Sequence, residues 1–206
     1  MAHRHRRRPG TVRGHPLRDA RRLLGFGLRH AGGGPVSCTV RPRRSEDLSV
    51  LAEVLVRVHA ADGYPVEGVA NPGEWLDQPR TLGSWVALVG DSPVGQVILK
   101  AAEKTDDAAA AWAIHTGGEI TRLALVVRLF VDPDHRKVGA GRKLLAAALD
   151  RAHILHRAVA LDVMEKDRDA IRLYRRMGGV QLSRIVHQHS EGQAEGGLVF
   201  GFGSLT

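Results

Sequence analysis

The sequence has little of what several common protein classes need. One cysteine, Cys38, stands among 206 residues, which excludes an internal disulfide and agrees with a reducing compartment. No run of 18 apolar residues occurs, so no membrane span is expected. Arg29 and His30 interrupt the short apolar segment after Arg21-Arg22 before it reaches the length of an export signal. We therefore expect a cytoplasmic protein.

Aromatic residues are scarce, at 4%, and the charge is unevenly distributed. Residues 1–30 hold nine Arg and one acid, Asp19, whereas residues 31–206 hold 21 basic and 21 acidic side chains. The net charge of +8 therefore belongs to the N-terminal segment, whose one aromatic residue, Phe26, gives no platform for stacking bases. These arginines could contact nucleic-acid or lipid phosphates, or form a solvated arm without a role.

We predict a disordered Arg-rich tail over residues 1–34, with at most weak nucleic-acid contacts, and one folded domain over residues 35–206. The boundary is the segment Gly32-Gly33-Gly34-Pro35. A domain of this length can bury a proper core.

The residues around 123–156 predict a strand, a tight basic turn and a helix. The nearly continuous apolar run over 123–131 is typical of a strand covered on both faces, and Pro133 should end the pairing of that strand. No Pro or Gly falls between Arg142 and His156, and apolar residues recur there at helical spacing. A helix should begin near Gly139.

That turn has the composition of an anion site. The first turn of a helix leaves backbone N–H groups without partners, and glycines 139 and 141 would let an anion approach them. A Walker A loop would need Lys-Ser or Lys-Thr after the last glycine, and a Rossmann fingerprint would need a glycine at Leu144. Neither motif fits. The alternative to an anion site is that the two glycines only relieve crowding in the turn between strand and helix.

Several motifs in one order resemble the GNAT family of acetyl-CoA-dependent N-acetyltransferases. They are Arg128-Leu129-Phe130-Val131, Pro133, Arg136-x-x-Gly139-x-Gly141, Leu161-Asp162-Val163, and Asp167-x-x-Ala170-x-x-Leu173-Tyr174-x-x-x-Gly178. The resemblance covers about residues 36–206 in architecture and is specific over 128–178. It implies an α/β fold with a mixed, mostly antiparallel sheet, flanked by helices, whose central parallel strand pair is splayed.

The resemblance also implies residue roles. The turn would bind the pyrophosphate of acetyl-CoA, and the bulged central strand would hold the pantetheine arm and the oxyanion. Tyr174 would donate a proton to the departing CoA thiolate, and Asp167 would lie at the cofactor. The expected cofactor-binding residues are Leu129, Phe130, Val131, Arg136, Lys137, Val138, Gly139, Ala140, Gly141, Arg142, Asp167 and Tyr174.

The resemblance also implies that the loop after the first helix, which contains His59, Asp62 and Tyr64, lies over the acceptor site. The alternative is that His59 caps a helix end and Tyr64 packs beside Pro65. The general base stays open. Many relatives carry a Glu three positions before the Arg of the strand motif, and this chain has Leu125 there. Glu119, His59, Asp62, Asp162 and solvent are the alternatives.

Outside these motifs, 84–89 and 94–99 predict a hairpin, and 101–118 an insertion with one short helix. Ser45 should cap the first helix and Asp167 the last. His187 and His189 would share one side of a strand, but without a third ligand no metal site is expected.

We expect transfer of an acetyl group from acetyl-CoA to a primary amine, on a small molecule or a protein, by direct attack. The alternative is a non-catalytic acyl-CoA-binding module whose tail contacts nucleic acid. The family makes a homodimer plausible, although no motif in the sequence supports one.

Overall fold

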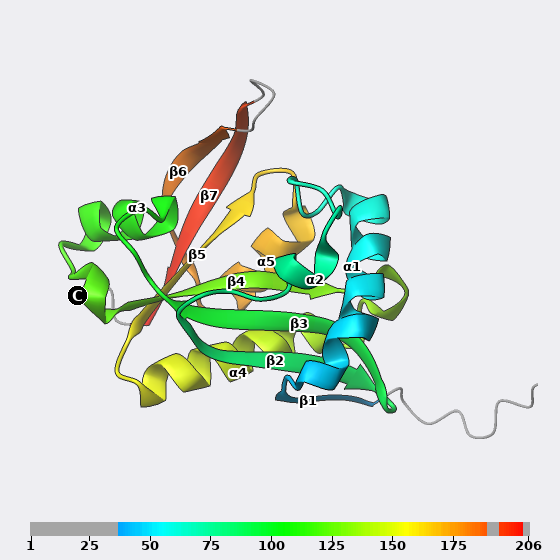
Figure 1. Ribbon diagram of the computed structural model, residues 1–206. Helices are drawn as coiled ribbons and strands as arrows, with labels where there is room; N and C mark the ends of the chain where they lie inside the picture. Colours follow the sequence, from blue (N-terminus) through cyan, green and yellow to red (C-terminus); the bar gives the residue numbers. More distant parts are fainter. Residues whose placement is uncertain (1–36, 189–193, 204–206) are drawn as a thin grey trace, which may run out of the picture. The chain divides into compact units, whose positions relative to one another are not determined.

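A seven-stranded mixed sheet runs through the computed structural model, which describes residues 37–188 and 194–203 (Figure 1). Its strand order is β1-β2-β3-β4-β5-β7-β6. Every neighbouring pair is antiparallel except β4 and β5. The strands are β1 (Cys38–Pro42), β2 (Thr81–Val89), β3 (Ser92–Ala101), β4 (Leu123–Val131), β5 (Ala158–Met164), β6 (Val180–Gln188) and β7 (Ala194–Phe202). The expected fold class is confirmed. The predicted tail, residues 1–34, lies outside the described residues.

Helices cover both faces of the sheet (Figure 1). One face carries α4 (Ala140–Ile154) and α5 (Arg168–Arg176), whose apolar residues pack on alternate residues of the strands. The other carries α1 (Leu48–Asp62), the short α2 (Pro72–Trp75) and α3 (Asp107–Thr116). Strand β4 is buried from both sides because Leu125 faces α3 and Val126 faces α4. This explains its continuous apolar sequence.

The start of α1 differs from the prediction. A single 3-10 turn, η1 (Ser45–Asp47), precedes the helix, and the capping acceptor is the buried Asp47, not Ser45. The Asp47 carboxylate accepts the backbone N–H of Arg44 at 2.7 Å and two hydrogen bonds from the Arg41 guanidinium, both 2.7 Å. A carboxylate is a stronger acceptor than a hydroxyl, and Asp47 accepts the amide that precedes η1, while no side chain caps α1 itself.

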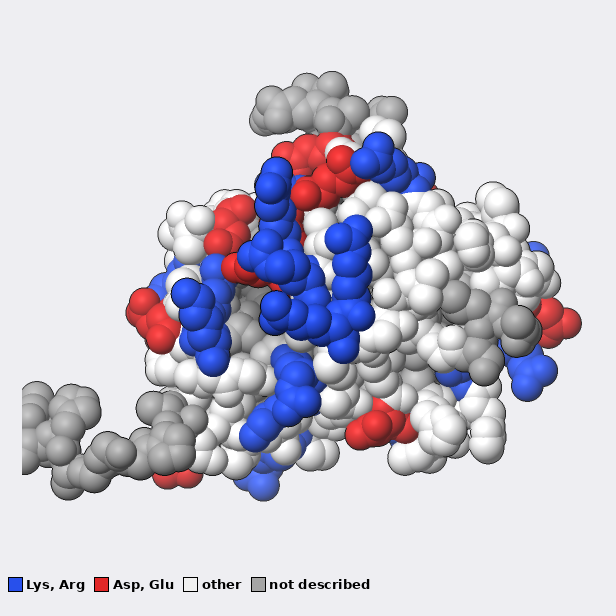
Figure 2. Space-filling view, turned by 180° about the vertical axis from the view of Figure 1, so that it is seen from behind, with Lys and Arg blue, Asp and Glu red and all other residues white. Residues whose placement is uncertain are grey.

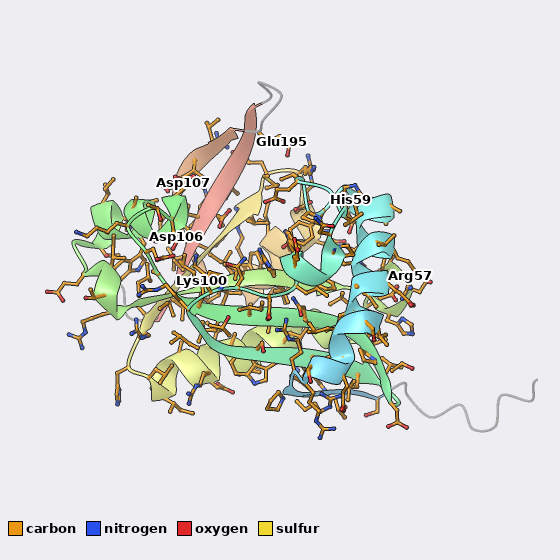
Figure 3. The ribbon with its side chains drawn as sticks, viewed as in Figure 1. Arg57, His59, Lys100, Asp106, Asp107 and Glu195 are labelled. Atoms are coloured by element: carbon orange, nitrogen blue, oxygen red, sulfur yellow. The ribbon has the colours of Figure 1, made fainter. Side chains whose placement is uncertain are left out.

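The predicted hairpin and insertion are both confirmed. Strands β2 and β3 pair over nearly their whole length, and α3 ends at Gly117 in the left-handed conformation. The buried Lys100 at the end of β3 pairs with Asp106 at 2.8 Å, which fixes the start of the insertion (Figure 3). The insertion therefore covers the paired end of β4 and β5 with α3.

Candidate functional site

The parallel strands β4 and β5 separate partway along their length. Their pairing covers only Leu123–Leu125 against Ala158–Ala160, although β4 continues to Val131 and β5 to Met164. Beyond that point β4 pairs only with β3, and β5 only with β7. The facing edges therefore keep backbone N–H and C=O groups without ladder partners, which a ligand can satisfy. The expected splay of the central pair is confirmed.

A β-bulge in β4 accompanies the separation. One residue of β3, Val97, faces two residues of β4, Arg128 and Leu129. Arg128 has a φ of 54°, in the left-handed region. Bulges bend a strand and redirect its edge, so the segment Leu129–Val131 leaves the direction of β5. This is the segment expected to hold the pantetheine arm and the oxyanion.

The turn from β4 into α4 contains two left-handed residues. Lys137 has a φ of 66° and Gly139 a φ of 83°, and Gly139 is the N-cap of α4. No side chain makes a capping hydrogen bond to this helix. The first amides of α4 therefore lack both an intrahelical and a side-chain acceptor, at the positive end of the helix dipole. Such an arrangement favours a bound anion.

The two glycines of the turn have different surroundings. A Cβ at Gly139 would meet no atom within 4 Å, but its backbone conformation is one that L side chains rarely adopt. A Cβ at Gly141 would lie 3.4 Å from Leu173 Cδ2 and 3.9 Å from Val131 Cγ2. Gly141 therefore faces the packed junction with α5, and Gly139 faces open space. Of the two, Gly139 is the one suited to an approaching anion.

Lys and Arg side chains gather on the α4 and α5 face of the molecule, which Figure 2 shows from behind. The exposed cations of the turn and these helices include Arg136, Lys137, Arg142, Lys143, Arg168, Arg172, Arg175 and Arg176. Clustered positive charge raises the local concentration of anionic ligands.

Arg136 of the turn is paired with Asp62 at the end of α1. Its guanidinium donates two hydrogen bonds to the Asp62 carboxylate, one of them 3.1 Å long between Nη1 and Oδ1. Asp62 was expected at the acceptor and Arg136 at the cofactor. The structure joins the two through this ion pair.

A second ion pair, which sequence reasoning missed, ties α1 to the start of the same turn. Asp132 is buried, and Arg57 donates to its Oδ2 from Nη2 at 2.6 Å and from Nε at 3.2 Å. Burial alone would raise the pKa of Asp132, but the bonds from Arg57 and from the Asp134 amide hold that pKa below its ordinary value. Figure 3 shows Arg57 on the outer side of α1.

Tyr174 lies on the side of α5 that packs against the sheet. It is 6% exposed, and its ring packs against Phe200 and Phe202 with centroid distances of 5.9 and 6.4 Å. Burial, and after it the negative charges of Asp162 and Asp167, raise the pKa of Tyr174 above the ordinary value. The phenol is therefore protonated at neutral pH, as a proton donor must be.

Asp167 occupies the predicted N-cap position of α5, but its side chain makes no capping hydrogen bond. Burial raises the pKa of the Asp167 carboxyl. The positive charge of Lys166 lowers that pKa, and the negative charges of Asp62 and Glu195 raise it further. Asp167 thus lies among other acids at the open end of β5 and does not serve as a helix cap.

The predicted acceptor loop brings an aromatic pair to the α1 face. Tyr64 meets the Trp75 ring edge-on at 5.4 Å, and Arg128 lies over that ring at 4.4 Å and donates to the Asp77 carbonyl at 2.5 Å. Burial raises the pKa of Tyr64, and the neighbouring Tyr174 contributes to the same shift. Sequence reasoning missed Trp75, and it named Arg128 only as part of the strand motif, since neither residue forms a local motif with Tyr64.

His59 points to its own loop. Its Nδ1 lies 3.0 Å from the Pro65 carbonyl oxygen, which can only accept, so Nδ1 carries the proton. The ring therefore fixes the loop that follows α1, so His59 bonds a loop carbonyl and not the helix-end carbonyls that the capping alternative names. Figure 3 shows it at the end of α1 nearest that loop.

No group of three or more His, Cys, Asp or Glu among residues 37–188 and 194–203 could hold a metal ion. His189 lies outside those ranges, so the His187–His189 pair cannot be described. None of the described helices is both long and apolar enough to cross a bilayer.

Comparisons with known proteins agree with this geometry. The family model for the acetyltransferase (GNAT) family matches residues 53–179. No curated protein matches the sequence significantly. Among solved structures, the fold is similar to yncA, a putative acetyltransferase from Salmonella typhimurium with its cofactor acetyl-CoA, at a TM-score of 0.60 and 15% identity, covering 80% of this chain and 92% of that chain.

Two further solved structures show the same likeness. The ribosomal-protein-S18-alanine N-acetyltransferase from Escherichia coli matches with a TM-score of 0.57 and 18% identity, over 80% of this chain and 92% of that chain. Arabidopsis thaliana NAA60 in complex with acetyl-CoA matches with a TM-score of 0.59 and 21% identity, over 81% and 98%. At such identities the likeness concerns the fold alone. The family model, in contrast, matches more than half of the sequence. The chain therefore belongs to the acetyltransferase (GNAT) family and, as a member of that family, is an N-acetyltransferase that uses acetyl-CoA as its co-substrate.

Proposed function

We propose that this N-acetyltransferase moves the acetyl group directly from the CoA thioester to a primary amine bound on the α1 side of the opening between β4 and β5. The observation that carries the proposal is the position of the uncapped turn Arg136–Arg142 at the end of the strand that separates from β5. A buried, protonated Tyr174 on the α5 side favours an enzyme over a non-catalytic acyl-CoA-binding module.

In this proposal the amides of the turn Arg136–Arg142 bind the pyrophosphate. The open edge of β4 at Leu129–Val131 binds the pantetheine arm through its backbone and donates to the oxyanion of the tetrahedral intermediate. Arg136 and Lys137 add positive charge at the turn. The residues present fit acetyl-CoA because its anionic and amide parts need backbone donors and acceptors, which the turn and the open strand edge provide.

Tyr174 acts as the general acid. When the amine nitrogen attacks, the C–S bond breaks and the sulfur leaves with the electron pair, so it must be protonated. The Tyr174 hydroxyl is protonated at neutral pH and supplies that proton. His59 and Tyr64 line the acceptor loop, and Asp62 links that loop to the cofactor turn through Arg136.

Calorimetric titration of acetyl-CoA tests the binding half of the proposal. The wild-type protein should bind, and Gly139→Glu should abolish binding because its side chain enters the open space beside the turn and repels phosphate. Gly139→Ala is the matched control, since it introduces the same backbone strain without the bulk or the charge. A folded wild-type protein that does not bind acetyl-CoA would refute the assignment.

Release of the CoA thiol, measured against an amine panel, tests the chemical half. The panel contains spermidine, amino acids, phosphinothricin and a peptide with an N-terminal alanine, since relatives include a ribosomal-protein-S18-alanine and a putative phosphinothricin N-acetyltransferase. Tyr174→Phe should lower kcat by about 100-fold and leave acetyl-CoA affinity nearly unchanged. A Phe variant with the wild-type kcat would remove Tyr174 from the mechanism.

A further inference from the structure

Asp162 is the first polar side chain on the acceptor face of β5 beyond the point where β4 and β5 part. The last parallel pair joins Leu125 to Ala160. Residues two apart on a strand share a face, so Asp162 lies on the side of Ala160, toward α3 and α1, and not on the α4 side where Leu161 and Val163 are buried. Asp162 itself is exposed.

The backbone at this position is held firmly. On its other edge β5 pairs with β7 from Val159 to Met164, and Asp162 stands opposite Val199. The hydrogen bonds to β7 hold β5 in place, while its other edge at Asp162 faces the opening. The Asp162 carboxylate is therefore attached to a strand within the sheet, which suits a functional group that must be accurately positioned.

Two phenols share the surroundings of this carboxylate. After burial, the Asp162 charge is the strongest influence raising the pKa of Tyr174, and it also contributes to the raised pKa of Tyr64. Tyr174 comes from α5, Tyr64 from the loop after α1, and Asp162 from β5. Three separate elements therefore bring an acid, a carboxylate and a second phenol to one end of the opening.

The other candidate bases are less suitably placed. Glu119 precedes β4 at the end where β4 and β5 are still paired, which is the opposite end from the bulge. Asp62 is tied to the turn before α4 by two hydrogen bonds from Arg136. His59 directs Nδ1 to the Pro65 carbonyl and serves the loop.

We infer that Asp162 holds the acceptor amine as its ammonium ion and accepts the protons that the nitrogen loses during acetyl transfer. This inference rests on the proposed function. It assigns to β5 the basic role that many relatives give to a Glu at the position of Leu125.

The proton balance is complete without another reactant. An ammonium acceptor loses one proton before the N–C bond forms, which frees the nitrogen lone pair, and a second proton as the C–S bond breaks. Each leaves nitrogen through Asp162, one passing to solvent and one replacing the proton that Tyr174 gives to sulfur. A bound cation or proton at Asp162 also cancels the charge that raises the pKa of Tyr174, so Tyr174 becomes a better donor when the amine is in place.

The test compares Asp162→Asn, Asp162→Glu and His59→Gln in the full chain. Acetyl-CoA affinity by calorimetry should stay within threefold of wild type in all three. With the best acceptor from the amine panel, kcat/KM should fall about 100-fold in Asp162→Asn, with a raised amine KM, and recover partly in Asp162→Glu. His59→Gln should lose less than tenfold.

A second probe separates a chemical role from a structural one. Hydroxylamine is largely neutral at the assay pH and needs no carboxylate to hold a positive charge. Acetohydroxamate formation should therefore fall less than tenfold in Asp162→Asn. Equal losses with both nucleophiles, a wild-type rate in Asp162→Asn, or a larger loss in His59→Gln would overturn the inference. A wild-type protein that binds acetyl-CoA and acetylates neither hydroxylamine nor any panel amine would refute the proposed function itself.

Discussion

The ion pair between Arg57 and Asp132 should contribute measurably to stability, and Arg57→Met tests it. Methionine keeps most of the apolar stem of arginine and removes the charge. The Asp132 side chain is only 3% exposed, whereas that of Arg57 is 47% exposed. Removing one partner of a fully buried pair costs about 3–5 kcal/mol, and an exposed pair contributes about 0–1 kcal/mol.

This pair is half-buried, and Asp132 keeps two weaker partners in the variant. Its Oδ1 still accepts the Asp134 amide at 3.2 Å, and His135 Nδ1 lies 3.7 Å from Oδ2. We therefore expect Arg57→Met to lower the free energy of unfolding by about 2 kcal/mol, between the two limits. Acetyl-CoA affinity should also fall several-fold, because Asp132 starts the turn that is proposed to bind pyrophosphate.

Urea denaturation followed by circular dichroism measures the cost, and Arg44→Met is the matched control. Arg44 pairs with Glu46 at 3.2 Å, but both side chains are more than 60% exposed. The control should change stability by less than about 0.5 kcal/mol. Equal losses in the two variants, at unchanged m-values, would show that the buried carboxylate does not depend on Arg57.

Three further predictions follow from the same contacts. Hydrogen bonds from Arg41 and Arg57 help hold the pKa values of Asp47 and Asp132 below their ordinary values. The two carboxylates therefore stabilise the folded protein fully above about pH 4, and this stabilisation is lost as pH falls through their folded-state pKa values. Measuring the free energy of unfolding as a function of pH should show this decline, and a flat profile would contradict it. Gly139→Ala should cost about 1–2 kcal/mol because its φ is 83°, whereas Gly141→Ala should be neutral or stabilising by about 0.5 kcal/mol; thermal denaturation that ranks them in reverse would disprove the distinction. Asp62→Asn should bind acetyl-CoA about threefold more tightly by calorimetry, since the Asp62 carboxylate competes with phosphate for Arg136, and weaker binding would instead mean that the pair positions Arg136 for the ligand.

The sequence alone predicted the segments whose structure depends on neighbours along the chain. The strand over 123–131, the turn to Gly139 and the helix after it are confirmed because an apolar run, a proline and a left-handed glycine act within a few residues of one another. The capping prediction at Ser45 was wrong for the opposite reason. Asp47 is the acceptor because Arg41 of β1 folds back onto it, and a propensity scale does not include that contact.

The family and the strand, turn and helix over 123–154 could thus be determined from the sequence, because the motif is contiguous and its backbone geometry is local. The tertiary structure decided which side chains surround the opening. Tyr64 belongs to the loop after α1, whereas Asp162 and Tyr174 belong to the consecutive elements β5 and α5 in the second half of the chain, and the fold brings Tyr64 close enough to both for them to influence one another. The Arg57–Asp132 pair joins α1 to the turn after β4 in the same way, since its stabilisation comes from a contact between residues remote in the chain that no local pattern records.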